Sequence, residues 1–181
     1  MASNGKNIVY FDLETQKSFD EVGGRTPDHF RQLRISVGVS YSTRDDQYRI
    51  FHEGNAHELI KQLMSADLVV GHNIIHFDYL VLSAYSPLDL TQVPTLDTLV
   101  EIEKILKHRL SLDAIAKSTL GNTKIANGLD AIRWWREGGT ENILKIAIKA
   151  SLLSGKLLMS SHGKLKNSQI AIGLPVSKRV L

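Results

Sequence analysis

The feature that most limits the fold is the segment NIVYFDLETQ at residues 7–16, where an apolar run leads directly into two acidic residues. A short, continuous apolar run is typical of a strand that is buried on both faces. Residues 7–13 are therefore predicted to form a central strand of a sheet that is covered on both sides. Because alternate side chains of a strand point the same way, Asp12 and Glu14 are expected to lie side by side at its end.

Two neighbouring carboxylates repel each other unless a cation neutralises them. From the spacing alone, the simpler interpretation is that the strand has ended and that both acids face water, because short motifs often match by chance. The segment VVGHNIIHFDYLVL favours the other interpretation, since it places Asn73 at the end of a second strand and Asp78 at the start of a helix. A strand end and a helix start can bring their acids into one cleft, where oxygen ligands suit Mg²⁺ or Mn²⁺ rather than zinc.

The rest of the pattern predicts strands first and helices later. Residues 34–42 alternate, which predicts a half-buried strand. Its covered side would carry Ile35, Val37, Val39 and Tyr41. Residues 47–54 and 68–73 are the other predicted strands. The segments expected to be helical are 55–67, 77–85, 98–107, 111–121, 129–139 and 140–153. This order favours an α/β fold, in which helices pack on the faces of a mixed sheet.

Composition excludes several classes of protein. The chain has 181 residues, of which 43% are hydrophobic and 23% are charged, as expected for one globular domain. It has no cysteine, which excludes disulfides and cysteine-based zinc sites. No apolar run approaches membrane-spanning length, and the first residues lack the apolar core of a signal peptide. We therefore expect a cytoplasmic location and no membrane partner.

Charge is distributed very unevenly along the chain. All 19 acidic residues lie in residues 1–141, which carry a net charge of −4. Residues 142–181 hold seven Lys and Arg and no acid. With about one residue in eight normally acidic, the odds of forty residues without any are on the order of 1%. This segment is either a basic arm for nucleic acid or a region foreign to the fold.

Four segments in this order resemble the successive motifs of the DEDD 3′–5′ exonucleases of the ribonuclease H-like superfamily: YFDLET, VVGHNIIHFDYLVL, TLDTL and LSLDAIAKSTLG. The resemblance covers about residues 7–141 and is nearest to stand-alone bacterial exonuclease domains and family B polymerase proofreading domains. It implies a ribonuclease H-like fold, with a mixed five-stranded sheet and helices on both faces. It also implies hydrolysis of single-stranded ends by two divalent ions, Mg²⁺ or Mn²⁺. Asp12, Glu14 and Asp78 match three of the four catalytic, metal-binding carboxylates.

The resemblance also implies roles for three other residues. Thr15 matches a position that meets the terminal nucleotide. Asn73 matches a polar residue that either contacts the substrate or holds the turn. Asp97 matches an acid often present in the superfamily, and it is expected to be either a further site residue or a structural one.

The fourth carboxylate of the family has no counterpart in this chain. In the tyrosine-bearing branch, a later helix carries Tyr and Asp four residues apart on one face. The helix expected at 140–153 has Ile146 and Ala150 there, and neither can bind a metal or polarise a water. The packing face is kept as an apolar stripe, formed by Ile143, Ile146, Ala147, Ala150 and Leu153.

Three explanations fit the missing acid. The chain is a non-catalytic relative, residues 142–181 come from a shifted reading frame or a damaged gene end, or Glu137 or Glu141 substitutes. A shifted frame ranks first because it would also explain the acid-free segment. The rival histidine-bearing branch would use His108 and Asp113, which have its spacing but fit better as surface residues of the helix after the TLDTL segment.

The sequence therefore predicts a ribonuclease H-like exonuclease domain at residues 1–155 and a basic tail at residues 156–181. Its predicted function is that of a 3′–5′ exonuclease acting on single-stranded DNA or RNA, with strongly impaired hydrolysis. One alternative is a non-catalytic nucleic-acid-binding module that is accessory to a helicase or polymerase. Another is a structural subunit that uses the fold for protein contact.

Overall fold

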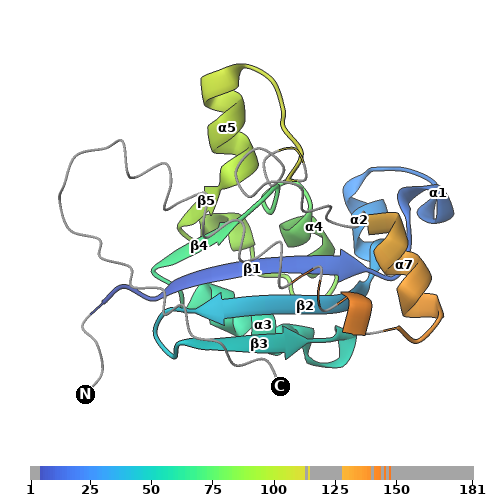
Figure 1. Ribbon diagram of the computed structural model, residues 1–181, viewed down its shortest axis with the longest axis horizontal. Helices are drawn as coiled ribbons and strands as arrows, with labels where there is room; N and C mark the ends of the chain where they lie inside the picture. Colours follow the sequence, from blue (N-terminus) through green and yellow to red (C-terminus); the bar gives the residue numbers. More distant parts are fainter. Residues whose placement is uncertain are drawn as a thin grey trace.

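The computed structural model describes residues 5–112, 114, 128–139, 141–143, 145 and 147. Five strands form one sheet in the order β3-β2-β1-β4-β5 (Figure 1). They are β1 (Ile8–Thr15), β2 (Ile35–Ser42), β3 (Gln47–Phe51), β4 (Leu68–Gly71) and β5 (Thr95–Asp97). β1 pairs antiparallel with β2 and parallel with β4. The predicted mixed five-stranded sheet with a central first strand is thus confirmed.

Helices cover both faces of this sheet, as predicted. They are α1 (Phe19–Val22), α2 (Pro27–Leu33), α3 (Ala56–Met64), α4 (Asp78–Leu82), α5 (Thr98–Leu106) and α7 (Gly128–Arg136). Two 3-10 turns are η1 (Glu53–Asn55) and η2 (Leu90–Gln92). α3 and α7 lie on opposite faces of the sheet (Figure 1). In the part of the chain that the structure describes, no helix is long and apolar enough to cross a membrane.

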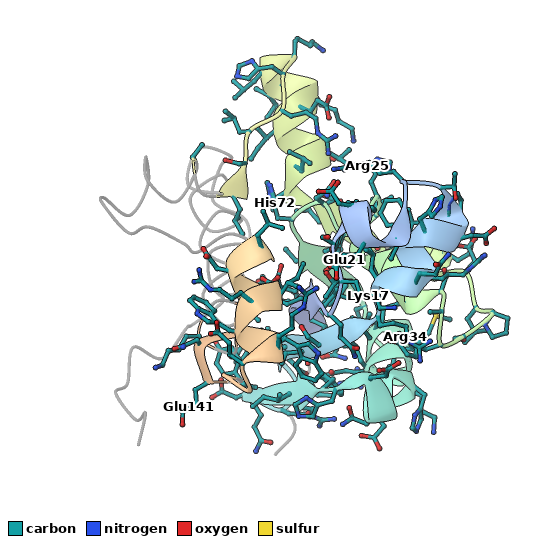
Figure 2. The ribbon with its side chains drawn as sticks, turned by 90° about the vertical axis from the view of Figure 1, so that its right-hand side faces the viewer. Lys17, Glu21, Arg25, Arg34, His72 and Glu141 are labelled. Carbon is teal, nitrogen blue, oxygen red and sulfur yellow. The ribbon has the colours of Figure 1, made fainter. Side chains whose placement is uncertain are left out.

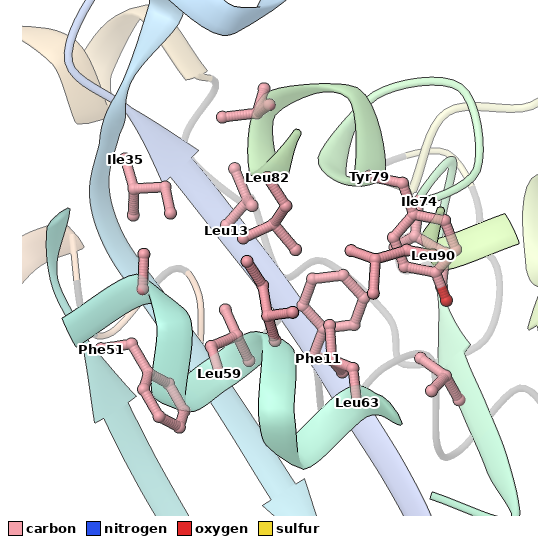
Figure 3. Close-up of a cluster of buried hydrophobic side chains, with 14 of the residues drawn as sticks. Phe11, Leu13, Ile35, Phe51, Leu59, Leu63, Ile74, Tyr79, Leu82 and Leu90 are labelled. Carbon is pink, nitrogen blue, oxygen red and sulfur yellow. The ribbon is translucent and has the colours of Figure 1, made fainter. Parts of the chain in front are cut away.

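The larger core lies between the sheet and α2, α3 and α4 (Figure 3). Phe11 and Leu13 of β1 enter it together with Leu59 and Leu63 of α3, and all four are buried. The ring of Phe11 stacks on that of Tyr79, with 6.0 Å between the ring centroids. Burying one such side chain contributes about 2–3 kcal/mol relative to leaving it exposed. Because Phe11 and Leu13 point into this core, the alternate side chains of β1 point to the other face of the sheet.

A smaller core lies under α7 on that other face. Val37 and Val39 of β2 pack there against Ala131 of α7. Ile143 and Ala147 are buried in the same cluster and have helical backbone. These two residues therefore keep the packing role predicted for the apolar stripe. The other members of the stripe, Ile146, Ala150 and Leu153, lie outside the described residues, as do most of the predicted helix at 111–121 and the whole tail at 156–181.

β2 corrects the prediction of a half-buried strand. Both of its faces are covered, and Ile35 faces the α3 side while Val37 faces the α7 side. The register explains the change, because Glu14 pairs with Val37 but Thr15 pairs with Ile35. Ser36 is therefore an extra residue in β2, and such a β-bulge reverses the alternation of side chains on either side of it. The bulge lies directly opposite the acidic end of β1.

The strand ends also differ from the predicted ones. β1 continues to Thr15, so the interpretation in which the strand ends before Asp12 is wrong. β4 ends at Gly71 rather than at residue 73, and β3 ends at Phe51 before η1 begins. Gly71 has no room for a side chain, since a Cβ there would lie 2.3 Å from Cγ2 of Ile74. This close approach holds the end of β4 against the segment that leads into α4.

Candidate functional site

Asp12 and Glu14 lie on the face of the sheet that α7 covers. Asp12 pairs with Val39 and Glu14 with Val37, and cross-strand partners share a face. Both acidic side chains are half-buried. A Cβ placed on Gly128, the first residue of α7, would lie 3.9 Å from Oε2 of Glu14. The end of β1 and the first turn of α7 thus form two sides of the site.

Asp78 joins these acids from a different element. It is the first residue of α4, and its side chain is buried. The backbone N–H of Leu13 donates a hydrogen bond to Oδ1 of Asp78 over 3.1 Å. Because β4 ends at Gly71, this bond takes the place of strand pairing at the end of β1. The structure therefore brings together the three carboxylates that the sequence predicts.

The electrostatic surroundings disfavour ionisation of all three groups. Burial, followed by the charges of Glu14 and Asp78, raises the pKa of Asp12 well above its usual range. Burial raises the pKa of Glu14 to about 7. Burial also raises the pKa of Asp78 well above its usual range, although the Leu13 N–H bond opposes this. The three groups interact through their charges, so a positive charge placed among them would favour their ionised forms.

The donor set fits a hard divalent cation in its chemistry, since all three side chains offer carboxylate oxygens. Within the described residues, however, no three His, Asp or Glu side chains are arranged closely enough to hold a metal ion. Asp12, Glu14 and Asp78 are therefore adjacent but do not form a closed ligand set. The two divalent ions implied by the resemblance remain a proposal.

Asp97 has a different setting from the three grouped acids. It is the last residue of β5 and is buried. Oδ1 accepts hydrogen bonds from the backbone N–H groups of Asn73 (2.7 Å) and Leu99 (3.0 Å). Oδ2 accepts a third from the N–H of Ile75 (3.0 Å). Its carboxylate is thus used to hold the turn between β4 and α4 and to cap α5, which favours the structural interpretation.

The two predicted substrate-binding residues lie at the same edge of the sheet. Thr15 is buried at the end of β1, and its hydroxyl donates to the carbonyl of Lys17. Asn73 follows β4 and has a φ of 64°, in the left-handed region that Asn tolerates better than most residues. Its Oδ1 accepts a hydrogen bond from Nη2 of Arg109 over 2.9 Å. The side-chain oxygen of Asn73 is thus already engaged within the protein.

Sequence reasoning missed the cationic side chains that surround this edge. Arg109 reaches Asn73 across 36 residues, and Arg136 at the end of α7 pairs with Glu21 of α1 across 115 residues. Figure 2 faces this side of the molecule and shows Lys17, Glu21, Arg25 and His72 on it. No local spacing connects such partners. The only sequence signal was the capping pattern of Ser18 and Glu21, which predicts the start of α1.

The substitutes proposed for the fourth carboxylate do not reach this group of acids in the structure. Glu137 and Glu141 are both exposed. Figure 2 shows Glu141 at the opposite end of the α7 segment from His72. His108 is exposed as well, while Asp113 lies outside the described residues. Neither the substitution nor the histidine-bearing alternative therefore gains support from the described residues.

No protein-family model matches the chain, and no curated protein matches it in sequence. Solved structures do match it in shape. One is the family B DNA polymerase from the hyperthermophilic archaeon Pyrobaculum calidifontis, with 14% identity and a TM-score of 0.59. The match covers 86% of this chain but only 24% of the polymerase chain. The fold is ribonuclease H-like. At this identity the likeness concerns the fold alone, because function resides in the site.

Proposed function

We propose that this chain is a ribonuclease H-like domain of the 3′–5′ exonuclease type, which binds the end of a single-stranded DNA or RNA at its carboxylate site. The observation that carries the proposal is the grouping of Asp12, Glu14 and Asp78 at the carboxyl end of the central strand. Burial and mutual repulsion would make such a group costly unless a cation binds there. The fold supports the proposal because a family B DNA polymerase shares it.

Each residue then has a role. Asp12 and Glu14 would hold the catalytic metal, and Asp78 would aid the second metal through water. When bound, two Mg²⁺ or Mn²⁺ ions would activate a water and stabilise the leaving oxygen. Thr15 and Asn73 place the terminal nucleotide at the end of β1. The proposed substrate therefore lies along the sheet edge where β1, β4 and β5 end.

Hydrolysis is proposed to be strongly impaired. The sequence has Ile146 and Ala150 where the resemblance implies a tyrosine and a fourth carboxylate. A direct metal ligand contributes several kcal/mol to the transition state, so its loss slows the reaction about 100-fold or more. The same observation favours a second candidate function, a non-catalytic module that binds nucleic acid for a helicase or polymerase.

The test is metal-dependent digestion of a 5′-labelled single strand, with DNA and RNA in parallel and EDTA as the blank. The chain as given is compared with Ile146→Tyr/Ala150→Asp, and each is also made with Asp12→Ala. We expect little shortening by the chain as given. We expect shortening from the 3′ end by the double variant, which Asp12→Ala abolishes.

Two outcomes would overturn the proposal of an impaired exonuclease. Rapid shortening that persists in the Asp12→Ala protein would place the activity elsewhere. A double variant that binds the strand but never shortens it, in either Mg²⁺ or Mn²⁺, would favour the non-catalytic module instead. Binding of the strand is measured separately in EDTA, where no hydrolysis occurs. It shows whether a variant that does not shorten the strand still binds it.

A further inference from the structure

Arg109 is held at the candidate site by a side chain that was predicted to meet the substrate itself. Its Nη2 donates to Oδ1 of Asn73 over 2.9 Å. The backbone N–H of Asn73 is bound in turn to Asp97 over 2.7 Å. Asn73 is therefore fixed at both its backbone and its side chain. The guanidinium of Arg109 is fixed with it, at the end of β4.

Among the described residues, the partners of the Arg109 guanidinium are Asn73 and Glu103. The side chain of Arg109 is 58% exposed. Within the described part of the chain, Glu103 is the carboxylate paired with Arg109, and its Oε2 lies 3.9 Å from Nε, which is too long for a hydrogen bond. A guanidinium has five N–H donors, and Asn73 takes one of them. Arg109 thus presents a planar group of donors, a shape that matches the oxygens of a phosphate.

The position of Arg109 relative to the acids follows from the pairing of the strands. β4 runs parallel to β1, with Val70 opposite Tyr10. The residues that follow Gly71, Asn73 among them, therefore lie beside the acidic end of β1. The hydrogen bond from Arg109 to Asn73 places the guanidinium at this sheet edge. Arg109 thus brings a positive charge to the sheet edge at which the acidic end of β1 also lies.

We propose that Arg109 binds a backbone phosphate of the single strand and that Asn73 is the positioning residue that holds it there. The inference rests on the proposed function, in that a single strand is the ligand. Carboxylates repel a polyanion, so a site built from them needs adjacent cations to retain the strand. Asn73 acts through Arg109 because its Oδ1 accepts from the guanidinium, while its backbone N–H is bound to Asp97. In this proposal Asn73 positions Arg109 and does not itself contact the substrate.

The test is the binding of a fluorescent oligothymidylate to the full chain in EDTA, followed by anisotropy at several salt concentrations. Arg109→Ala should weaken binding about tenfold and reduce the slope of log K against log salt by about 0.7, the value expected for one phosphate of a single strand. Arg109→Lys should bind more tightly than Arg109→Ala but less tightly than the unmodified chain, since lysine keeps the positive charge but lacks the planar set of N–H donors. Arg49→Ala is the matched control, because Arg49 is exposed on β3 and bound to Asp45.

A double-mutant cycle tests the role of Asn73. Asn73→Gly keeps the positive φ accessible but removes the amide. It should weaken binding in the presence of Arg109 and have no further effect in the Arg109→Ala protein. An equal loss in both backgrounds would mean that Asn73 contacts the strand directly, and would overturn the positioning role. Thermal unfolding of each variant confirms that the fold is kept.

The remaining outcomes separate this inference from the proposed function. If the unmodified chain binds the strand and Arg109→Ala binds it equally well with the same salt slope, the inference fails and the proposed function stands. If the unmodified chain binds neither oligothymidylate nor oligouridylate, the proposed function fails and the inference fails with it. A difference between the two oligonucleotides would show whether the ligand is DNA or RNA.

Discussion

The acidic side chains at the sheet edge of the candidate site lie in two opposite kinds of surroundings. Asp97 receives three backbone hydrogen bonds from the segments around it. Asp12, Glu14 and Asp78 instead interact with one another, and the pKa of each is raised. The comparison separates two uses of a buried carboxylate. A carboxylate surrounded by donors stabilises the fold, whereas carboxylates that surround one another leave a place for a cation or for protons.

The largest effect is expected from removing the donor-bound acid. Asp97→Ala leaves three backbone N–H groups without their acceptor, and each buried group costs about 1–3 kcal/mol. We expect the free energy of unfolding to fall by about 3–5 kcal/mol in urea titrations. Asp45→Ala, which removes an exposed partner of Arg49, is the control and should cost less than about 1 kcal/mol. Equal losses in the two variants would refute the structural role of Asp97.

The grouped acids should respond in the opposite direction. The pKa of Glu14 is raised from 4.5 to about 7, so between these pH values the folded chain holds a proton that the unfolded chain has lost. Stability therefore decreases as pH rises through this range. The glutamine side chain of the Glu14→Gln variant cannot ionise. In EDTA and above pH 7, this variant should therefore be more stable than the unmodified chain by about 3 kcal/mol. Below pH 4.5 the two proteins should not differ in this way.

The measurement for this prediction is urea unfolding at several pH values, with Glu101→Gln as the control. Glu101 is exposed and pairs with Lys104, so its substitution should change stability little at any pH. If Glu14→Gln were less stable than the unmodified chain at pH 8, the surroundings of Glu14 would not disfavour its ionised form. The contrast between the two groups of carboxylates would then disappear.

Substituting a solvent-exposed carboxylate should change the stability much less than substituting either Asp97 or Glu14. Asp28 of α2 pairs with Arg31 over 2.7 Å, and its side chain is 80% exposed. Asp28→Ala should lower stability by only about 0.3–0.5 kcal/mol, as expected for an exposed pair within a helix. The loss should diminish further at high salt because the interaction is screened. A loss as large as that of Asp97→Ala would show that burial does not govern the comparison.

The sequence predicted those parts of the fold that have a local signal. The apolar run of residues 7–13 identified the central strand, and helical periodicity located α3, α5 and α7. β5 was not assigned, because a strand of three residues, Thr95–Asp97, is too short to show periodicity. The bulge at Ser36 was missed for another reason. A small polar residue between Ile35 and Val37 looks like ordinary alternation, and only the pairing with β1 reveals the extra residue.

The positions of the grouped acids were predicted where a motif places acids close to strand ends, and their roles stay a prediction. Asp12, Glu14 and Asp78 meet as expected, because parallel strands bring their carboxyl ends to one edge. The structural role of Asp97 could not be predicted, since its donors at Asn73 and Ile75 lie more than twenty residues away. The hydrogen bond between Arg109 and Asn73 was hidden for the same reason. Partners far apart in the chain leave no mark on local spacing.

The order of strands in the sheet also has a consequence for how the chain folds. β1, β2 and β3 follow one another and pair as antiparallel neighbours, and their paired residues are at most 33 positions apart, as in Val9 and Ser42. β4 pairs with β1 in parallel, and its paired residues are 60 positions apart, as in Ile8 and Leu68, so a longer stretch of chain must be closed. Longer loops close more slowly and at a greater entropic cost. We therefore expect β1, β2 and β3, with Asp12 and Glu14, to fold before β4 pairs with β1. Asp78 would then join these two acids only at that later step.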